Sequence, residues 1–293
     1  MKIGLQIPSF TWQGGEAMIG RRLAEIAQTA DGVGFDSIWV MDHFLQIRGV
    51  GQPEEPMLEG YSALNFIAAH TLKARLGTLV TGVIYRHPGM LVKSVTTLDV
   101  LSAGRAYLGI GAAWNEQESR GLGIPFPPIK ERFERLEEAL QIARQMWSGK
   151  VEQFTGKYYQ LERTLNSPQP LSRPHPPILI GGGGERKTLR LVAKYADACN
   201  LFLRLGEEAM RHKLDVLKRH CDQIGRSYEE IEKTGLDTIQ IAPGSMTPFQ
   251  LVEKCRGLSE NGFQHVIFNM PNVSEIEPLE IIGREAIPEI KAL

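Results

Sequence analysis

Short apolar runs alternate with long amphipathic stretches from one end of the chain to the other, and this alternation limits the fold more than any other feature. Most of the runs lack charged residues, as expected for strands of a parallel sheet that is covered on both faces. Repeated strand–helix units predict an α/β fold, and eight of them are enough to close a (β/α)8 TIM barrel. The predicted strands are Lys2–Ile7, Ser37–Met41, Leu76–Val83, Ala106–Ile110, Ile178–Ile180, Ala198–Phe202, Thr238–Ile241 and His265–Phe268.

The chain length and the two longest connections fit one barrel domain with insertions. A barrel of this type takes about 250 residues, and the chain has 293. Long segments follow the second predicted strand, at His43–Tyr61, and precede the fifth, at Gly149–Pro177. Within the latter, Phe154–Leu161 has the pattern of a small hairpin. We see no domain boundary there and predict a single domain over residues 1–293.

Charge and composition exclude several classes of protein. The 33 basic residues are nearly balanced by 34 acidic ones and do not cluster, so a nucleic-acid partner is not expected. No apolar run reaches the roughly 18 residues of a membrane span. Because the chain also begins with a strand pattern, we expect a cytoplasmic protein with no membrane partner. The three cysteines and seven histidines are scattered, and we predict no metal site.

The second predicted strand ends in two side chains that can act on protons. Barrel enzymes carry their catalytic groups where strands end, and Asp42 and His43 come at that point. His43 can exchange a proton near neutral pH, and Asp42 can orient a ring by hydrogen bonding. The alternative is a structural pair held by hydrogen bonds, and position alone leaves both interpretations open.

A run of four glycines follows the fifth predicted strand. Gly181–Gly184 lie between that strand and a helix, where backbone N–H groups can approach a phosphate closely. The alternative is a flexible turn. The run matches neither the P-loop nor the dinucleotide-binding pattern of a Rossmann fold, and we favour a phosphate site.

Small and polar residues also follow the fourth predicted strand. Ala112 leaves space for a flat ligand, and Asn115 can form a hydrogen bond with it. Trp114 is either a packing residue or a wall of the substrate site. Glu116 and Glu118 form either a solvated face or an acid pair.

Four segments together resemble the bacterial luciferase-like monooxygenase family. They are Gly34–Phe44, Leu76–Pro88, Leu101–Gly111 and Gly181–Gly184, and the resemblance covers nearly the whole chain. Two further segments, Trp114–Glu116 and Gly123–Phe126, resemble the branch of probable oxidoreductases that use the deazaflavin coenzyme F(420).

The resemblance implies how a cofactor would bind. The ring system would lie over the carboxyl end of the barrel beside His43 and Asp42, and the phosphate would lie at the glycine turn. A bulge in the third strand would contain a non-prolyl cis peptide at Leu79–Val80. The resemblance also implies a homodimer. The implied cofactor-binding residues are Leu79, Val80, Thr81, Ala112, Asn115, Gly181, Gly182, Gly183 and Gly184.

The implied activity is hydride transfer between coenzyme F(420) and a small organic substrate, with His43 as proton donor or acceptor. The alternatives are an FMN-dependent monooxygenase supplied by a separate reductase, and a non-catalytic flavin-binding protein of the same fold. Aromatic side chains at strand ends predict a rather apolar substrate pocket made of Phe10, Trp12, Phe44 and Trp114. The sugar-phosphate dehydrogenase branch carries a glutamate near the place of Trp114, which argues against a sugar-phosphate substrate.

Overall fold

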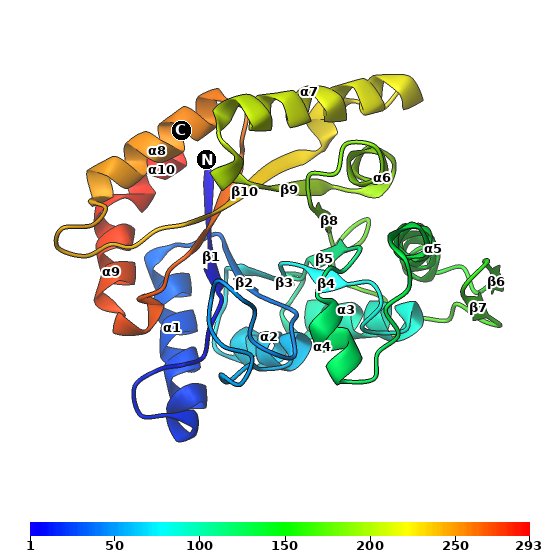
Figure 1. Ribbon diagram of the computed structural model, residues 1–293, viewed down its shortest axis with the longest axis horizontal. Helices are drawn as coiled ribbons and strands as arrows, with labels where there is room; N and C mark the ends of the chain where they lie inside the picture. Colours follow the sequence, from blue (N-terminus) through cyan, green and yellow to red (C-terminus); the bar gives the residue numbers. More distant parts are fainter.

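Eight parallel strands form a central barrel with helices around it (Figure 1), in a computed structural model that describes residues 1–293. The third strand is interrupted, so it appears as two segments. The strands are β1 (Lys2–Ile7), β2 (Ser37–Val40), β3 with β4 (Arg75–Thr78 and Thr81–Gly82), β5 (Leu108–Gly111), β8 (Ile178–Gly181), β9 (Ala198–Phe202), β10 (Glu232–Thr238) and β11 (His265–Asn269). The predicted α/β barrel class is confirmed.

The two ends of the sheet meet between β3 and β5. The Leu76 N–H donates to the Arg105 carbonyl at 2.9 Å, and the Tyr107 N–H donates to the Leu76 carbonyl at 2.7 Å. On the opposite side, β1 pairs with both β2 and β11. Because all of these pairings are parallel, the carboxyl ends of the strands share one rim of the barrel.

The helices lie outside the barrel, apart from a short one at the rim. The outer helices are α1 (Ile19–Val33), α2 (Gly60–Ala69), α3 (Pro88–Leu101), α5 (Ile129–Trp147), α6 (Thr188–Tyr195), α7 (Glu207–Ile224), α8 (Pro248–Glu260), α9 (Glu277–Glu285) and α10 (Ile287–Ala292). The rim helix is α4 (Glu116–Gly121), and four 3-10 turns lie at Glu16–Met18, Leu203–Leu205, Tyr228–Glu230 and Val273–Glu275. No helix is both long and apolar enough to cross a membrane.

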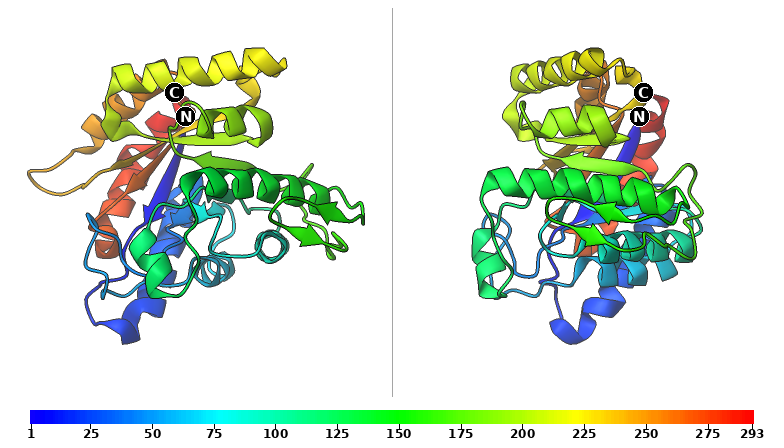
Figure 2. Two further views of the ribbon diagram at one scale, coloured as in Figure 1. Left: turned by 45° about the vertical axis from the view of Figure 1, so that its right-hand side comes forward. Right: turned by 90° about the vertical axis from the view of Figure 1, so that its right-hand side faces the viewer.

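Both predicted insertions lie outside the regular barrel. The hairpin expected at Phe154–Leu161 is confirmed: β6 (Phe154–Thr155) pairs antiparallel with β7 (Gln160–Leu161). It projects from the side of the barrel beyond α5 (Figure 2). The connection after β2 instead remains at the rim, where it approaches α4.

Side chains point alternately to the two faces of the strands, and this alternation separates two apolar cores. One large cluster fills the layer between the strands and the helices. A smaller cluster fills the barrel interior, since successive strand side chains point to opposite faces. The interior cluster consists of Trp39, Leu79, Tyr107, Leu179, Ala198, Leu236 and Ile267.

The seventh strand begins earlier than predicted. It runs from Glu232 to Thr238 and only its last residue overlaps the predicted Thr238–Ile241. Its early residues are polar: Lys233 and Thr234 are buried and Glu232 is partly buried. These side chains have partners, since the Glu232 carboxylate accepts from Lys2 Nζ at 2.7 Å and from the Tyr107 hydroxyl at 3.1 Å, and the Thr234 hydroxyl accepts from Asn200 Nδ2 at 2.8 Å. Sequence periodicity cannot recognise a strand whose buried face is hydrogen-bonded instead of apolar.

The partly buried Glu232 carboxylate should make stability depend on pH. Burial opposes ionisation of Glu232, but the nearby His265 ring and Lys2 ammonium outweigh it and lower its pKa from 4.5 to about 2. A lowered pKa means that the stabilisation is complete above pH 4.5 and is lost as the pH falls toward about 2. We expect Glu232→Gln to flatten the fall in unfolding free energy over this range by roughly 1–3 kcal/mol.

Urea unfolding at a series of acidic pH values measures this effect. Glu260→Gln, at an exposed position without an ion pair, is the matched control and should leave the pH dependence unchanged. Equal slopes for Glu232→Gln and the wild type would show that Glu232 does not supply the acid sensitivity.

Candidate active site

Asp42 and His43 lie at the barrel rim directly after β2, and both side chains are buried. The Asp42 carboxylate accepts hydrogen bonds from Arg86 Nη1 at 2.6 Å and from Nη2 at 2.9 Å. Arg86 also forms an ion pair with Glu59, the residue that precedes α2. Burial opposes the charge on Arg86, but the hydrogen bonds and charge of Asp42 raise its pKa. Asp42 is thus held by Arg86, and its expected role in orienting a ring stays a prediction.

The partner of the His43 ring is Glu118 of α4. His43 Nδ1 lies 2.8 Å from Glu118 Oε2, and the carboxylate is completely buried. The Tyr85 hydroxyl donates to the same oxygen at 2.8 Å. The other oxygen accepts from the backbone N–H of Phe44 and from that of Leu45, the latter at 3.1 Å. Of the two arrangements left open for Glu118, the solvated face is therefore wrong.

These contacts favour the ionised form of Glu118. Burial raises the pKa of its carboxyl, but hydrogen bonds and charge from His43 and the two backbone N–H groups outweigh burial, so the pKa lies below its ordinary value. Burial beside this carboxylate in turn raises the pKa of Tyr85. Tyr85 therefore remains a hydrogen-bond donor, and Glu118 an acceptor, over the neutral pH range.

The segment after β5 is braced from α5. Arg132 Nη1 donates to the Ala113 carbonyl at 2.5 Å and to the Ala112 carbonyl at 3.4 Å. Ala113 has a φ of 62°, a left-handed conformation that is uncommon for alanine. The Asn115 side chain caps α4 by accepting from the Glu118 N–H at 3.3 Å. Sequence patterns did not identify Arg132, because its role depends on contacts across two elements.

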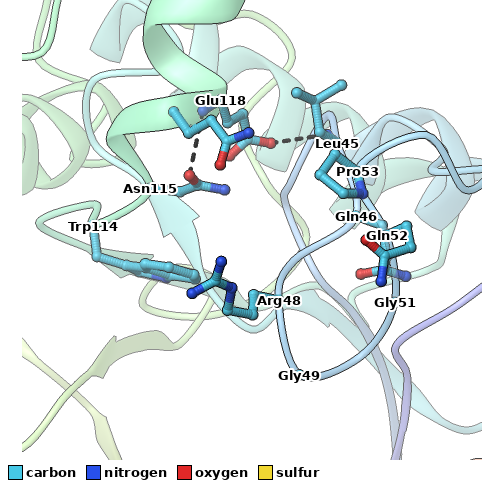
Figure 3. A pocket seen from close by; sticks show the side chains of 11 residues that line it. Leu45, Gln46, Arg48, Gly49, Gly51, Gln52, Pro53, Trp114, Asn115 and Glu118 are labelled. Atoms are coloured by element: carbon cyan, nitrogen blue, oxygen red, sulfur yellow. Dashed lines mark hydrogen bonds between the residues drawn. The ribbon is translucent and has the colours of Figure 1, made fainter.

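A pocket of about 610 Å³ opens beside the His43–Glu118 pair, between the loop after β2 and the start of α4 (Figure 3). The Trp114 indole, 61% exposed, forms one wall and lies edge-on to His43 with ring centroids 5.4 Å apart. The Arg48 side chain points toward this indole across the pocket that both residues line (Figure 3). Most of the lining is polar, including Gln46, Arg48, Gln52, Asn115 and Gln117.

Of the four aromatic residues predicted to form a substrate pocket, only Trp114 lines this one, and the predicted pocket stays a prediction. Phe10 is buried in the core and packs against Trp12 with centroids 5.5 Å apart. Phe44 packs against Tyr85 at 5.2 Å. Strand-end position placed these rings near the rim but did not determine which way they point.

The interruption of the third strand occurs where the resemblance implied it. The Leu79–Val80 peptide is cis, and Gln6 Nε2 donates to the Leu79 carbonyl at 3.1 Å. The Val80 side chain fits between two glycines: a Cβ at Gly181 would lie 2.9 Å from it, and one at Gly111 3.0 Å. Thr81, expected at the cofactor, is fully buried, and its hydroxyl bonds to Tyr61 and Thr78.

The glycine turn after β8 leaves backbone donors free. The N–H groups of Gly183 and Gly184 donate to no protein acceptor, whereas Gly182 bonds to the Asn200 carbonyl at 3.1 Å and has a φ of 112°. Lys213 of α7 donates from Nζ to the Gly183 carbonyl at 2.8 Å. A positive charge and free N–H groups together suit a phosphate. Lys213 lies 30 residues from the turn and carried no sequence signal.

The rim as a whole fits a flavin-like group. The free N–H groups of the glycine turn can face a phosphate. At the end of β11, the Asn269 Oδ1 is buried without a hydrogen-bond partner. An unpaired buried acceptor is costly unless a ligand donates to it, and the imide N–H of a flavin or deazaflavin ring is such a donor.

Residues 1–244 match the family model described as luciferase-like monooxygenase. The chain belongs to the luciferase-like monooxygenase family. Among the similar curated proteins is an F(420)-dependent glucose-6-phosphate dehydrogenase of Nakamurella multipartita, 28% identical with 92% of this chain and 93% of the relative covered. An enzyme of the same name from Kineococcus radiotolerans is 27% identical with 92% and 93% covered.

Solved structures with the same luciferase-like fold include two F(420)-dependent enzymes. The tetrahydromethanopterin reductase of Methanopyrus kandleri is 17% identical, with a TM-score of 0.81 and 99% of both chains covered. An F(420)-dependent secondary alcohol dehydrogenase, solved with an F(420)–acetone adduct, is 19% identical, with a TM-score of 0.82 and 99% and 98% covered. This luciferase-like chain is therefore an F(420)- or flavin-dependent oxidoreductase.

The buried ion pair at the rim predicts a large effect of Arg86 on stability. Arg86→Met leaves the Asp42 carboxylate, whose side chain is fully buried, without its partner. Removing one member of a buried pair costs about 3–5 kcal/mol, and we expect a loss of this size in the unfolding free energy measured with urea. Arg86→Lys keeps the charge but not both hydrogen bonds, and should lose less.

Arg163→Met is the control, because Arg163 is exposed and has no ion pair; its unfolding free energy should stay within about 0.5 kcal/mol of wild type. A similarly small loss for Arg86→Met would mean that Asp42 finds another partner or takes up a proton.

Proposed function

We propose that this chain transfers hydride between coenzyme F(420) and a small organic substrate, with His43 exchanging the substrate proton. The observation that carries the proposal is the setting of His43: Nδ1 is held by the buried Glu118 carboxylate, and Nε2 has no protein partner. A ring held in this way at the barrel rim can give or take a proton at one defined atom. The Trp114 pocket beside it offers space for a substrate.

Residues of this chain would hold the coenzyme at the rim. The free N–H groups of Gly183 and Gly184, with Lys213, would bind the phosphate, and Asn269 would accept from the ring. The backbone of Leu79–Val80, whose peptide is cis, would lie against the ring centre, as the resemblance to the family implies. When bound, the coenzyme supplies a two-electron hydride acceptor or donor.

The proton step belongs to His43. With an alcohol as substrate, His43 Nε2 would take the hydroxyl proton, and with a carbonyl as substrate the protonated ring would return it. The bound coenzyme would supply the matching two-electron chemistry. Trp114, edge-on to His43 at 5.4 Å, would limit where the substrate carbon can lie.

Two features support F(420) over FMN as the coenzyme. Similar curated proteins carry names that specify F(420). In addition, Arg186, Lys187 and Arg204 are exposed after β8 and β9, where the acidic tail of F(420) would pass toward solvent. The alternative is an FMN-dependent monooxygenase with a separate reductase as partner. In either case we propose a homodimer, on the basis of the family.

The pocket favours a polar substrate. Arg48 is the basic side chain in a lining of amide side chains and glycines, and Glu118 is turned inward on His43. Because the Glu118 carboxylate already accepts four hydrogen bonds, it is not free to act as the acid that the sugar-phosphate branch carries after this strand. This arrangement argues against glucose 6-phosphate, which the names of the relatives specify, as the substrate of this chain.

Binding titrations test the choice of coenzyme. We expect the purified protein to bind F(420) more tightly than FMN at low salt. Each exposed basic contact contributes only about 0.2–1 kcal/mol and is screened by salt, so the preference should be several-fold and should narrow at moderate salt. Tighter FMN binding, with oxygen consumption when a flavin reductase is added, would instead support the monooxygenase.

Gly183→Val tests whether the glycine turn binds the phosphate. A side chain there would meet the aliphatic part of Lys213 at about 3.0 Å and would cover the free N–H groups. We expect weaker binding of both coenzymes, because both carry the phosphate. Unchanged affinity in a folded variant would place the phosphate elsewhere.

Replacement of His43 tests the proton step. His43→Gln keeps a polar side chain but cannot shuttle a proton, so we expect kcat to fall about 10²–10⁴-fold with coenzyme affinity within a few-fold of wild type. Substrate screening with reduced and oxidised F(420) supplies the assay. A variant that retains the wild-type rate would show that His43 has a structural role only.

A further inference from the structure

We infer that Glu118 is a positioning residue that fixes the His43 ring in the tautomer with hydrogen on Nδ1, so that Nε2 carries the lone pair. The catalytic consequence of this assignment rests on the proposed function. The tautomer itself is independent of the proposed function, because it follows from the hydrogen bonds of this chain alone.

The first step is that one Glu118 oxygen can only accept. Oε1 receives the backbone N–H groups of Phe44 and Leu45, and a backbone N–H has no acceptor capacity. Neither N–H has another acceptor in the protein. A proton on Oε1 would therefore leave buried donors facing a donor, which is strongly unfavourable.

The second step concerns the other oxygen. Oε2 contacts both the Tyr85 hydroxyl and His43 Nδ1, each at 2.8 Å. The pKa of the Glu118 carboxyl is lowered by the donors around it despite its burial, so Oε2 is also an acceptor at neutral pH. His43 Nδ1 must then carry a hydrogen in both the neutral and the protonated ring.

The position of Glu118 is itself held by other elements. The Asn115 side chain caps its N–H at 3.3 Å, and the Ser119 hydroxyl donates to the Asn115 carbonyl at 3.0 Å. Arg132 fixes the two carbonyls just before this turn. The carboxylate thus reaches His43 from a braced segment that lies 75 residues away in the sequence.

Other charged and titratable groups near the pair have partners of their own. Asp42 and Glu59 both pair with Arg86. The Tyr85 hydroxyl donates to Glu118, and Arg132 is affected by the charge of the exposed Glu116. None of these contacts Nδ1, so the tautomer depends on Glu118.

Glu118→Gln gives a sharp test, because the amide has one acceptor and one donor end. The amide oxygen must face the N–H groups of Phe44 and Leu45, since the alternative opposes donors to donors. The amide nitrogen then faces His43 Nδ1, which has to accept. We therefore expect the neutral ring to invert to the tautomer with hydrogen on Nε2.

Two-bond ¹H–¹⁵N spectra of the histidine rings measure the tautomer directly, with the His43 signals assigned by their loss in His43→Gln. Spectra over a pH series should show Nδ1–H in the neutral wild-type ring and Nε2–H in Glu118→Gln. Tyr85→Phe is the matched control: it removes the other hydrogen bond to Oε2 and should retain Nδ1–H. Inversion in Glu118→Gln alone supports the assignment, and a ring that keeps Nδ1–H in that variant overturns it.

The same variants separate this inference from the proposed function. In oxidation of an alcohol, Glu118→Gln should lower kcat about 10²–10⁴-fold with little change in KM, because Nε2 then presents a hydrogen where the substrate proton must go. Inverted spectra with no turnover by the wild type on any substrate would leave the positioning role standing and would count against the hydride-transfer proposal.

Discussion

The completely buried carboxylate of Glu118 is the interaction on which the rim depends. It accepts from His43, Phe44 and Leu45 in the loop after β2 and from Tyr85 after β4, so a single side chain joins α4 to two other rim segments that are distant in the sequence. A buried charge is tolerated only with several donors. Those donors must all be present together, and this requirement fixes the geometry of His43.

The Asp42–Arg86 ion pair lies beside the His43–Glu118 pair. Asp42 and Arg86 are the sequence neighbours of His43 and Tyr85, and they bond to each other at 2.6 and 2.9 Å. Two adjacent residues after one strand are thus bound to two adjacent residues after another, either directly or through Glu118. These buried hydrogen-bonded charges make the rim rigid.

The pocket separates what the family shares from what this chain adds. The glycines around Val80 make room for its side chain, and the free N–H groups after β8 suit a phosphate. The polar lining around Arg48 and Trp114 comes from loop residues, which vary without any change of fold. Under the proposed function, the loop after β2 and the start of α4 would therefore determine the substrate class.

Local patterns in the sequence determined the barrel, the hairpin, and the glycine turn, because each depends on periodicity or on the backbone freedom of neighbouring residues. Family motifs added the cis peptide at Leu79–Val80. Only the tertiary structure decided that β10 begins at Glu232, that Phe10 is core, and that His43 pairs with a residue 75 positions away. The physical reason is that a polar side chain is stable in the interior only with a partner, and the closed barrel alone brings such partners together.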